Sequence, residues 1–181
     1  FNLAVFGAIS GVGIFGAQFF GCKNNRGLQH TLRFKLYICA GIVLLGILVL
    51  IFKGDDLILL YLHGEGNDQA LQMTLEYGRE YLWVMLTGLL PFAVEETYAS
   101  TLRECGETKL PMLAGVAAVL VNLVLNYLLI FGKFGFPELG VVGAAVATVV
   151  SRYVQAVIVI VWTHTHAEKM PFIVGAYREL K

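Results

Sequence analysis

The sequence predicts an all-α integral membrane protein, a polytopic helical bundle in which five helices cross the bilayer. Hydrophobic residues make up 57% of its 181 residues and charged residues only 14%, whereas soluble domains are about 25% charged. Its mean hydropathy is +0.72. Charged residues are absent from the stretches 1–22, 36–52 and 110–132. Because a bilayer core about 30 Å thick takes roughly 20 apolar residues of helix, each stretch is close to the length of one crossing.

Five apolar segments, each predicted to be one transmembrane helix, follow one another along the chain: 1–21, 35–52, 80–102, 111–131 and 140–163. The first is apolar from Phe1 onward and lacks the basic start of a signal peptide. We therefore expect the interior of a membrane helix here, and a chain that is a fragment. The second is free of charge from Leu36 to Phe52. An amphipathic pattern, QALQMTLEYGREYL, extends the third segment outward.

A Gly-rich turn (GKFGFPELG) joins the fourth and fifth segments, and the fifth contains a single charged residue, Arg152. Small residues recur four positions apart in two of the segments, at Gly7 and Gly11 in the first and at Gly143 and Ala147 in the fifth. This spacing lets helix backbones approach closely in a membrane. It predicts packing surfaces on these two helices.

The Lys and Arg residues between the segments predict the orientation of the bundle. Nine of them fall in three alternate connectors, 22–35, 103–110 and 164–181, and only three in the other two. Basic residues concentrate in the cytosolic loops of membrane proteins. We therefore expect these three connectors in the cytosol and the chain in the cell membrane as a multi-pass protein.

Composition and motifs exclude several classes of function. A formal net charge of zero gives no reason to expect nucleic-acid binding. The sequence has no phosphate-binding loop, no HExxH and no CxxC, so we expect no enzyme, no metal site and no cofactor. The three cysteines lie far apart and are interpreted as small, semi-buried hydrophobic residues. His164 and His166 diverge on a helix, which favours interfacial positions over metal binding.

Three uncharged polar residues, Asn122, Asn126 and Thr148, are predicted to lie at membrane depth. The two Asn residues are four apart and therefore share one helix face, and Thr148 reaches about the depth of Asn122 from the next helix. An amide without a partner is costly in hydrocarbon, so these groups must face protein or a water-filled cavity. They either line a cation and substrate cavity or join neighbouring helices through hydrogen bonds, and both interpretations stay open.

Three charged residues, Glu95, Glu96 and Arg152, are also predicted inside the membrane. Counted from the outer ends of their helices at about 1.5 Å per residue, their depths differ by only about 4 Å. Because a lone charge at that depth is costly, we expect Arg152 to form an ion pair with one of the two carboxylates. The other carboxylate would face the aqueous cavity or be protonated, and it is the better candidate for contact with the substrate. The alternative is that water reaches this part of the helix from the cytosol and solvates both carboxylates.

Residues 99–151 resemble the multidrug and toxic compound extrusion family. The matching pieces are LRECGETKLP, NLVLNYLLIFG and PELGVVGAAVAT, in that order, and the start, ISGVGIFGAQFFG, is similar to the second helix of the family. The resemblance implies that residues 1–163 are a partial N-lobe, helices two to six of a six-helix lobe. It also implies that 164–181 begin the connector to the second lobe.

The function that the resemblance implies is secondary active multidrug efflux, in which Na⁺ or H⁺ is exchanged for organic, often cationic compounds by alternating access. Asn122 matches the first residue of an Asn-x-x-x-Asp cation site in that family, Asn126 stands where the acid would be, and Thr148 matches a position near the site. The implied partners are the lipid bilayer, a small organic substrate, and the first helix and C-lobe of the same polypeptide. The alternatives are a lipid-linked precursor flippase of the same superfamily and a non-transporting structural membrane subunit.

Overall fold

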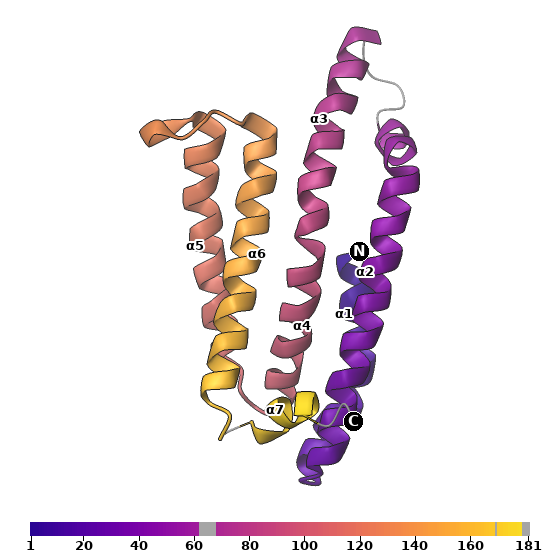
Figure 1. Ribbon diagram of the computed structural model, residues 1–181, viewed down its shortest axis with the longest axis vertical. Coiled ribbons are helices and arrows are strands. Elements are labelled where there is room, and N and C mark those ends of the chain that lie inside the picture. The colour runs from indigo at the N-terminus through magenta and orange to yellow at the C-terminus, as the bar shows by residue number, and fades with distance from the viewer. Residues whose placement is uncertain (62–67, 169, 179–181) are drawn as a thin grey trace.

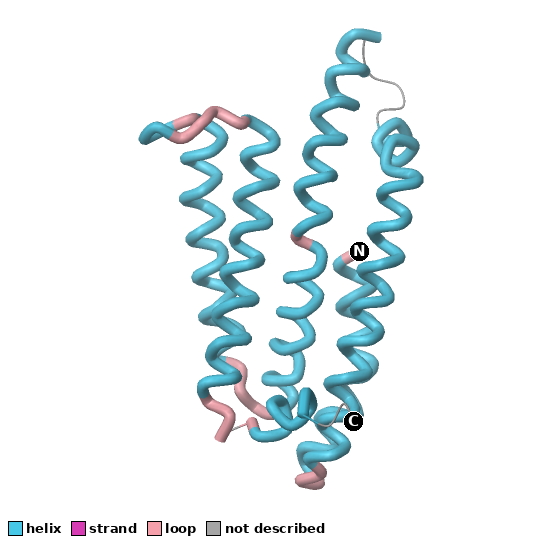
Figure 2. The backbone as a smooth tube through the Cα atoms, viewed as in Figure 1, coloured by secondary structure: helices cyan, strands magenta, loops and turns pink. Residues whose placement is uncertain are grey.

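The computed structural model describes residues 1–61, 68–168 and 170–178, which form a bundle of helices (Figure 1, Figure 2). In chain order the helices are α1 (Asn2–Gly21), α2 (Asn25–Tyr61), α3 (Asp68–Thr87), α4 (Leu89–Glu104), α5 (Lys109–Phe131), α6 (Gly140–Thr165) and α7 (Pro171–Arg178). A short 3₁₀ turn, η1 (Lys133–Gly135), lies between α5 and α6.

The helices stand side by side in three groups (Figure 1). α5 and α6 pair at one side, α1 and α2 pair at the other, and α3 and α4 follow one another end to end between them. α7 lies across the end of the bundle at which α4 finishes. By length and composition, α1, α2, α5 and α6 are each able to cross a membrane. The predicted class, an all-α polytopic membrane protein, is confirmed.

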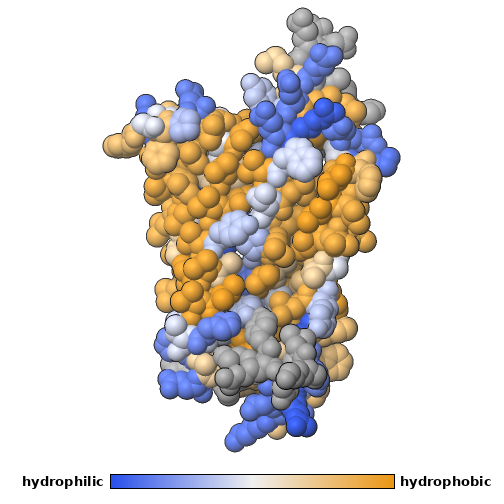
Figure 3. Space-filling view, in the orientation of Figure 1, coloured by the Kyte–Doolittle hydropathy of each residue, from blue (hydrophilic) through white to orange (hydrophobic). Residues whose placement is uncertain are grey.

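The outside of the bundle is apolar, as a bilayer requires. Figure 3 shows hydrophobic surface over the middle of one face and hydrophilic groups toward both ends. Leu3 and Phe52, for example, are 87% and 77% exposed. Buried apolar side chains among the described residues gather instead in two clusters. One joins α1, α2 and α4 around Ile9, and the other joins α2 and α4 to α5, α6 and α7 around Leu102.

The second predicted helix is longer than the segment 35–52. α2 has 37 residues, and it includes most of the basic stretch that we expected to be a connector. Asn24 explains where the helix starts, because its Oδ1 accepts a hydrogen bond from the N–H of Gly27 at 3.0 Å, as an N-capping side chain does. Lys35 therefore lies inside a helix.

The third predicted helix, 80–102, is divided into α3 and α4 at Gly88. Pro91 has no N–H, so the carbonyl oxygen of Thr87, four residues earlier, loses its partner within the helix. The hydroxyl of Tyr153 on α6 donates a hydrogen bond to that oxygen at 3.2 Å. The break is therefore satisfied by a neighbouring helix. At its other end, α3 begins at Asp68, in agreement with the amphipathic pattern.

Candidate functional site

The uncharged polar residues predicted at membrane depth form one cluster between α5 and α6. Asn126 Nδ2 donates a hydrogen bond to Asn122 Oδ1 at 2.8 Å, and Asn122 Nδ2 lies 3.4 Å from Thr148 Oγ1. Ser151 is not among the predicted residues, but its Oγ lies 3.5 Å from the same nitrogen. Its only signal in the sequence is its place three residues after Thr148, on the same side of a helix. We call these four residues the amide cluster.

The amide cluster is linked only weakly across the two helices. Its short hydrogen bonds stay within one helix: Asn126 to Asn122 on α5, and on α6 Thr148 to the Ala144 carbonyl at 2.9 Å and Ser151 to the Thr148 carbonyl at 2.8 Å. The contacts between helices, at 3.4 and 3.5 Å, are at the long end of the hydrogen-bond range. None of the described residues donates a hydrogen bond to Asn126 Oδ1. This half-buried cluster therefore still has acceptor capacity for a ligand.

The chemistry of the amide cluster suits a hard cation. Amide and hydroxyl oxygens are the ligands that such ions prefer, whereas transition metals take imidazole or thiolate. Across residues 1–61, 68–168 and 170–178, no three His, Cys, Asp or Glu side chains gather in one place. His164 and His166, the two histidines of the HxH pattern, have local partners instead. His166 stacks on Trp162 with the ring centroids 4.5 Å apart, and His164 Nδ1 lies 2.9 Å from the Ile160 carbonyl oxygen.

Glu95 and Glu96 have different partners. Glu95 is 4% exposed, and its Oε1 accepts a hydrogen bond from Gln155 Nε2 of α6 at 3.0 Å. Glu96 forms an ion pair with Arg103, about two turns further along α4. Adjacent residues point in different directions from a helix, and here only Glu95 is hydrogen-bonded to α6.

Arg152, for which the sequence predicts a carboxylate partner, forms no ion pair with Glu95 or Glu96 in this structure. Its guanidinium lies over the ring of Phe92, 4.6 Å from the ring centroid. Gln155, three residues further along α6, takes the position opposite Glu95. The depth of each residue follows from its place in the sequence, but the rotation of α6 about its own axis decides which side chain meets the carboxylate.

A second polar cluster joins α2 to α4 and was not predicted. Lys35 is 1% exposed and forms an ion pair with Glu104. Its Nζ also donates hydrogen bonds to Ser100 Oγ at 3.2 Å and Thr101 Oγ1 at 3.4 Å. Ser100 Oγ donates in turn to Glu104 Oε1 at 2.7 Å. We call these four residues the ion-pair cluster.

Two glycines of α1 make room for the ion-pair cluster. A Cβ atom added at Gly13 would lie 2.7 Å from Glu104 Oε1, and one added at Gly16 would meet the same carboxylate. The cluster therefore brings α1, α2 and α4 together. The sequence offers only the four-residue spacing of Ser100 and Glu104 as a signal, and Lys35 is 69 residues away from Glu104.

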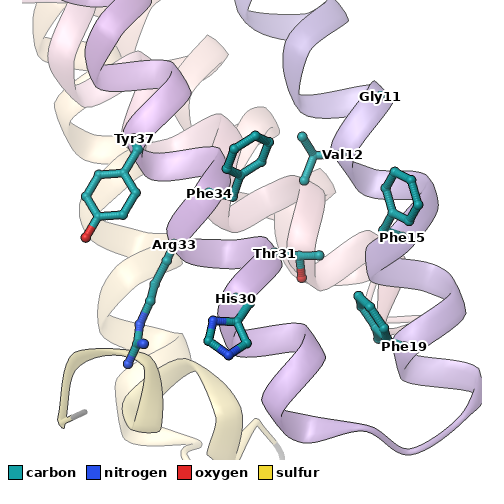
Figure 4. A pocket seen from close by; sticks show the side chains of 9 residues that line it. All are labelled: Gly11, Val12, Phe15, Phe19, His30, Thr31, Arg33, Phe34 and Tyr37. Carbon is teal, nitrogen blue, oxygen red and sulfur yellow. The ribbon is translucent and has the colours of Figure 1, made fainter. Parts of the chain in front are cut away.

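A groove of about 720 Å³ lies along α1 and α2 (Figure 4). It is lined mainly by apolar side chains, among them Phe15, Phe19 and Phe34. Arg33, at its edge, points toward α7 (Figure 4), where its Nε donates a hydrogen bond to the Ala176 carbonyl at 2.8 Å. None of the predicted site residues lines this groove. The structure therefore places the predicted site elsewhere, between α4, α5 and α6.

The fold and these clusters define a class of protein: a polytopic helical membrane protein with polar and ionisable groups inside the bundle and one helix broken at membrane depth. Such groups are expensive in lipid and mark functional sites in membrane proteins. The MatE family model matches residues 1–128. The chain belongs to this family, the multidrug and toxic compound extrusion family that residues 99–151 indicate.

Relatives and a solved structure agree with this assignment. The chain is 31% identical over 156 residues to a probable multidrug resistance protein NorM of Bacillus licheniformis, covering 86% of this chain and 32% of that protein. It is 47% identical over 78 residues to a probable NorM of Thermotoga maritima, covering 43% of this chain and 17% of that protein. A multidrug resistance MATE family transporter of the MOP superfamily, solved in an inward-facing conformation, shares the fold with a TM-score of 0.74 at 24% identity.

The match to that structure covers 88% of this chain and 34% of the solved one. The chain likewise spans about a third of the length of the Bacillus relatives that it matches.

Proposed function

We propose that this chain is part of a secondary active multidrug efflux transporter, and not of an enzyme, that exchanges a cation for an organic compound. Membership of the MatE family and the names of the NorM relatives support the proposal. The rest of the polypeptide would supply the first helix and the second lobe. In transporters built from repeats, substrate and coupling-ion sites lie near the bilayer midplane, and the repeats rock against each other around them.

The amide cluster is the observation that carries the proposal. Its oxygen atoms converge from α5 and α6, its contacts between helices are long, and Asn126 Oδ1 accepts no hydrogen bond from the described residues. None of its four side chains titrates near neutral pH, so the cluster itself holds no exchangeable proton. Uncharged oxygens do coordinate a metal cation. We therefore propose Na⁺ as the coupling ion bound here, with Asn122, Asn126 and Thr148 as ligands.

Substitution in the complete transporter tests this role. Asn122→Ala and Asn126→Ala are each expected to weaken Na⁺-driven efflux by about ten- to a hundredfold, the range seen when a metal site loses a supporting group. Dye efflux from energised vesicles, divided by the amount of folded transporter, is the measurement. Gln18→Ala, which removes an exposed amide from α1, is the matched control and should leave efflux unchanged.

The interpretation of the amide cluster as a link between helices makes a different prediction. If the amides only hold α5 against α6, Asn122→Ala and Asn126→Ala should lower the amount of folded transporter and the efflux in equal proportion. Asn126→Asp distinguishes the two roles further. A carboxylate at this position introduces a titratable group, so the pH dependence of efflux should differ from that of the wild type. A pH profile unchanged by Asn126→Asp would contradict a cation site at this position.

We also propose that residues 22–24, 105–108 and the region around α7 face the cytosol, in a cell-membrane protein. All three lie at the same end of the bundle (Figure 1), and the basic residues around them support the orientation.

The cysteines of the chain report the orientation without any substitution. Cys22 is exposed, whereas Cys39 and Cys105 are buried. Burial, with the adjacent Glu104 carboxylate, raises the pKa of the Cys105 thiol to about 12, so it stays protonated and unreactive at neutral pH. We expect a membrane-impermeant maleimide to modify Cys22 in inside-out vesicles only, as read from peptide masses. Modification of Cys22 in right-side-out vesicles would reverse the proposed orientation.

A further inference from the structure

Arg152 is a cation near the middle of the membrane. It lies 12 residues along α6 from the first residue of that helix, Gly140, which places it about 18 Å inward in a bilayer core about 30 Å thick. Its side chain is half-buried. An ionised residue at this depth is energetically costly unless it has a partner or faces water, and such residues mark functional positions.

The two carboxylates nearest in depth are already engaged elsewhere. Glu95 accepts its hydrogen bond from Gln155, and Glu96 pairs with Arg103. Within the described part of the chain, no group accepts a hydrogen bond from the Arg152 guanidinium, which lies over the face of the Phe92 ring. A cation over a ring is attracted to it, but the N–H donors of the guanidinium stay unpaired. These donors match the geometry of a carboxylate or phosphate.

The break between α3 and α4 does not need Arg152. Its orphan carbonyl, that of Thr87, is already satisfied by the Tyr153 hydroxyl. A Cβ atom added at Gly88 would lie 3.6 Å from Arg152 Cδ and 3.0 Å from Val149 Cγ2. The side chain of Arg152 therefore runs close to the backbone of the break at Gly88, and its guanidinium ends over the ring of Phe92 on α4.

Aromatic side chains lie near this position. The ring of Phe92, which the guanidinium covers, lies 6.2 Å from the ring of Phe1 between centroids, and Tyr153, the next residue along α6, is 47% exposed. A guanidinium beside aromatic rings can bind a negative charge and an aromatic ring of the same small molecule.

We infer that Arg152, with Phe92 and Tyr153, is a substrate subsite for aromatic compounds that carry a carboxylate. The carboxylate takes the free N–H donors of Arg152, and the ring system of the compound packs against Phe92 and Tyr153. The inference deepens the proposed efflux function and rests on it. It assigns to the place where α6 passes the break between α3 and α4 a preference for one chemical class among the organic compounds exported.

Two dyes that differ only in the carboxylate test the subsite. Tetramethylrhodamine carries a free carboxylate on an aromatic cation, and its methyl ester has the same rings and positive charge without it. Binding of each to the detergent-solubilised complete transporter is measured by fluorescence polarisation. Arg152→Gln is expected to weaken tetramethylrhodamine binding at least about tenfold and ester binding less than about twofold, as for loss of a charged hydrogen bond. Arg152→Lys should keep the wild-type ratio within about threefold.

Arg79→Gln, which removes an exposed cation paired with Asp55, is the matched control and should leave both affinities unchanged. An equal loss for the two dyes, with less folded protein, would overturn the subsite and assign Arg152 to a carboxylate elsewhere in the polypeptide. No change for either dye, or no binding of either dye to the wild type, would also overturn it. Dye efflux is recorded separately. Binding that depends on Arg152 without any export would support the subsite and contradict the efflux function.

Discussion

Replacing Glu104 by Gln is expected to lower the free energy of unfolding by about 3–5 kcal/mol, the cost of removing one partner of a buried ion pair. The Lys35 side chain is 0% exposed, so without the charge of Glu104 its ammonium is left in the bundle with only uncharged acceptors, among them the hydroxyls of Ser100 and Thr101. Lys35→Met should cost a similar amount, because it leaves Glu104 against the glycines of α1. SDS titration of the purified complete transporter in micelles measures both changes.

The double variant and a surface pair supply the controls. Lys35→Met combined with Glu104→Gln should cost clearly less than the sum of the two single changes, because residues in direct contact are not additive. Asp55→Asn breaks an ion pair with Arg79 in which both side chains are more than half exposed. It should leave the unfolding free energy nearly unchanged. If the Glu104 and Asp55 variants were equally stable, the ion-pair cluster would not be buried.

Replacing Gly143 by Ala is expected to destabilise the pairing of α5 with α6 by about 1–3 kcal/mol, as overpacking does. A Cβ atom at this position would lie 2.8 Å from the carbonyl oxygen of Leu129 and 2.9 Å from its carbonyl carbon. Backbone atoms cannot rotate aside as a side chain does. The same oxygen accepts a hydrogen bond from the N–H of Leu139 at 2.9 Å, which restrains the turn between the helices further.

Gly41→Ala is the matched control for Gly143→Ala. Gly41 also lies within a membrane helix, but a Cβ atom added there meets nothing within 4 Å. Since Ala favours helix over Gly by about 1 kcal/mol, this variant should be neutral or slightly more stable. Equal stabilities for the Gly41 and Gly143 variants would show that α5 and α6 do not touch at Gly143.

The two glycine patterns in the sequence illustrate how far a local motif is informative. Gly143 and Ala147 recur four apart and are both buried in the structure, as a packing surface requires. Gly7 and Gly11 have the same spacing, yet a Cβ atom at either position meets no other described residue within 4 Å. The spacing of small residues predicts which helix faces allow close approach. It does not predict on which of these faces another helix packs.

The amide cluster was accessible to prediction because it depends on local spacing. Asn122 and Asn126 share a face through their spacing of four, and Thr148 follows after one short turn, so the antiparallel pairing of α5 and α6 sets its depth. The break at Gly88 could be predicted from the sequence only in part. Pro91 is visible in the sequence, but the Tyr153 hydroxyl that satisfies the freed carbonyl comes from a helix 66 residues away.

From the sequence alone, the class of the protein, the location of most apolar segments, the family and the depth of each polar residue follow. The reason is that excluding charge from hydrocarbon is a property of each stretch of chain by itself. Only the tertiary structure decides the partners of the charges. Lys35 is the first residue of a predicted helix and Glu104 lies outside the predicted helices, yet they form a buried pair, and Arg152 lies at the depth of Glu95 yet contacts Phe92 instead. These contacts depend on how each helix is rotated about its axis, which the packing of the whole bundle determines.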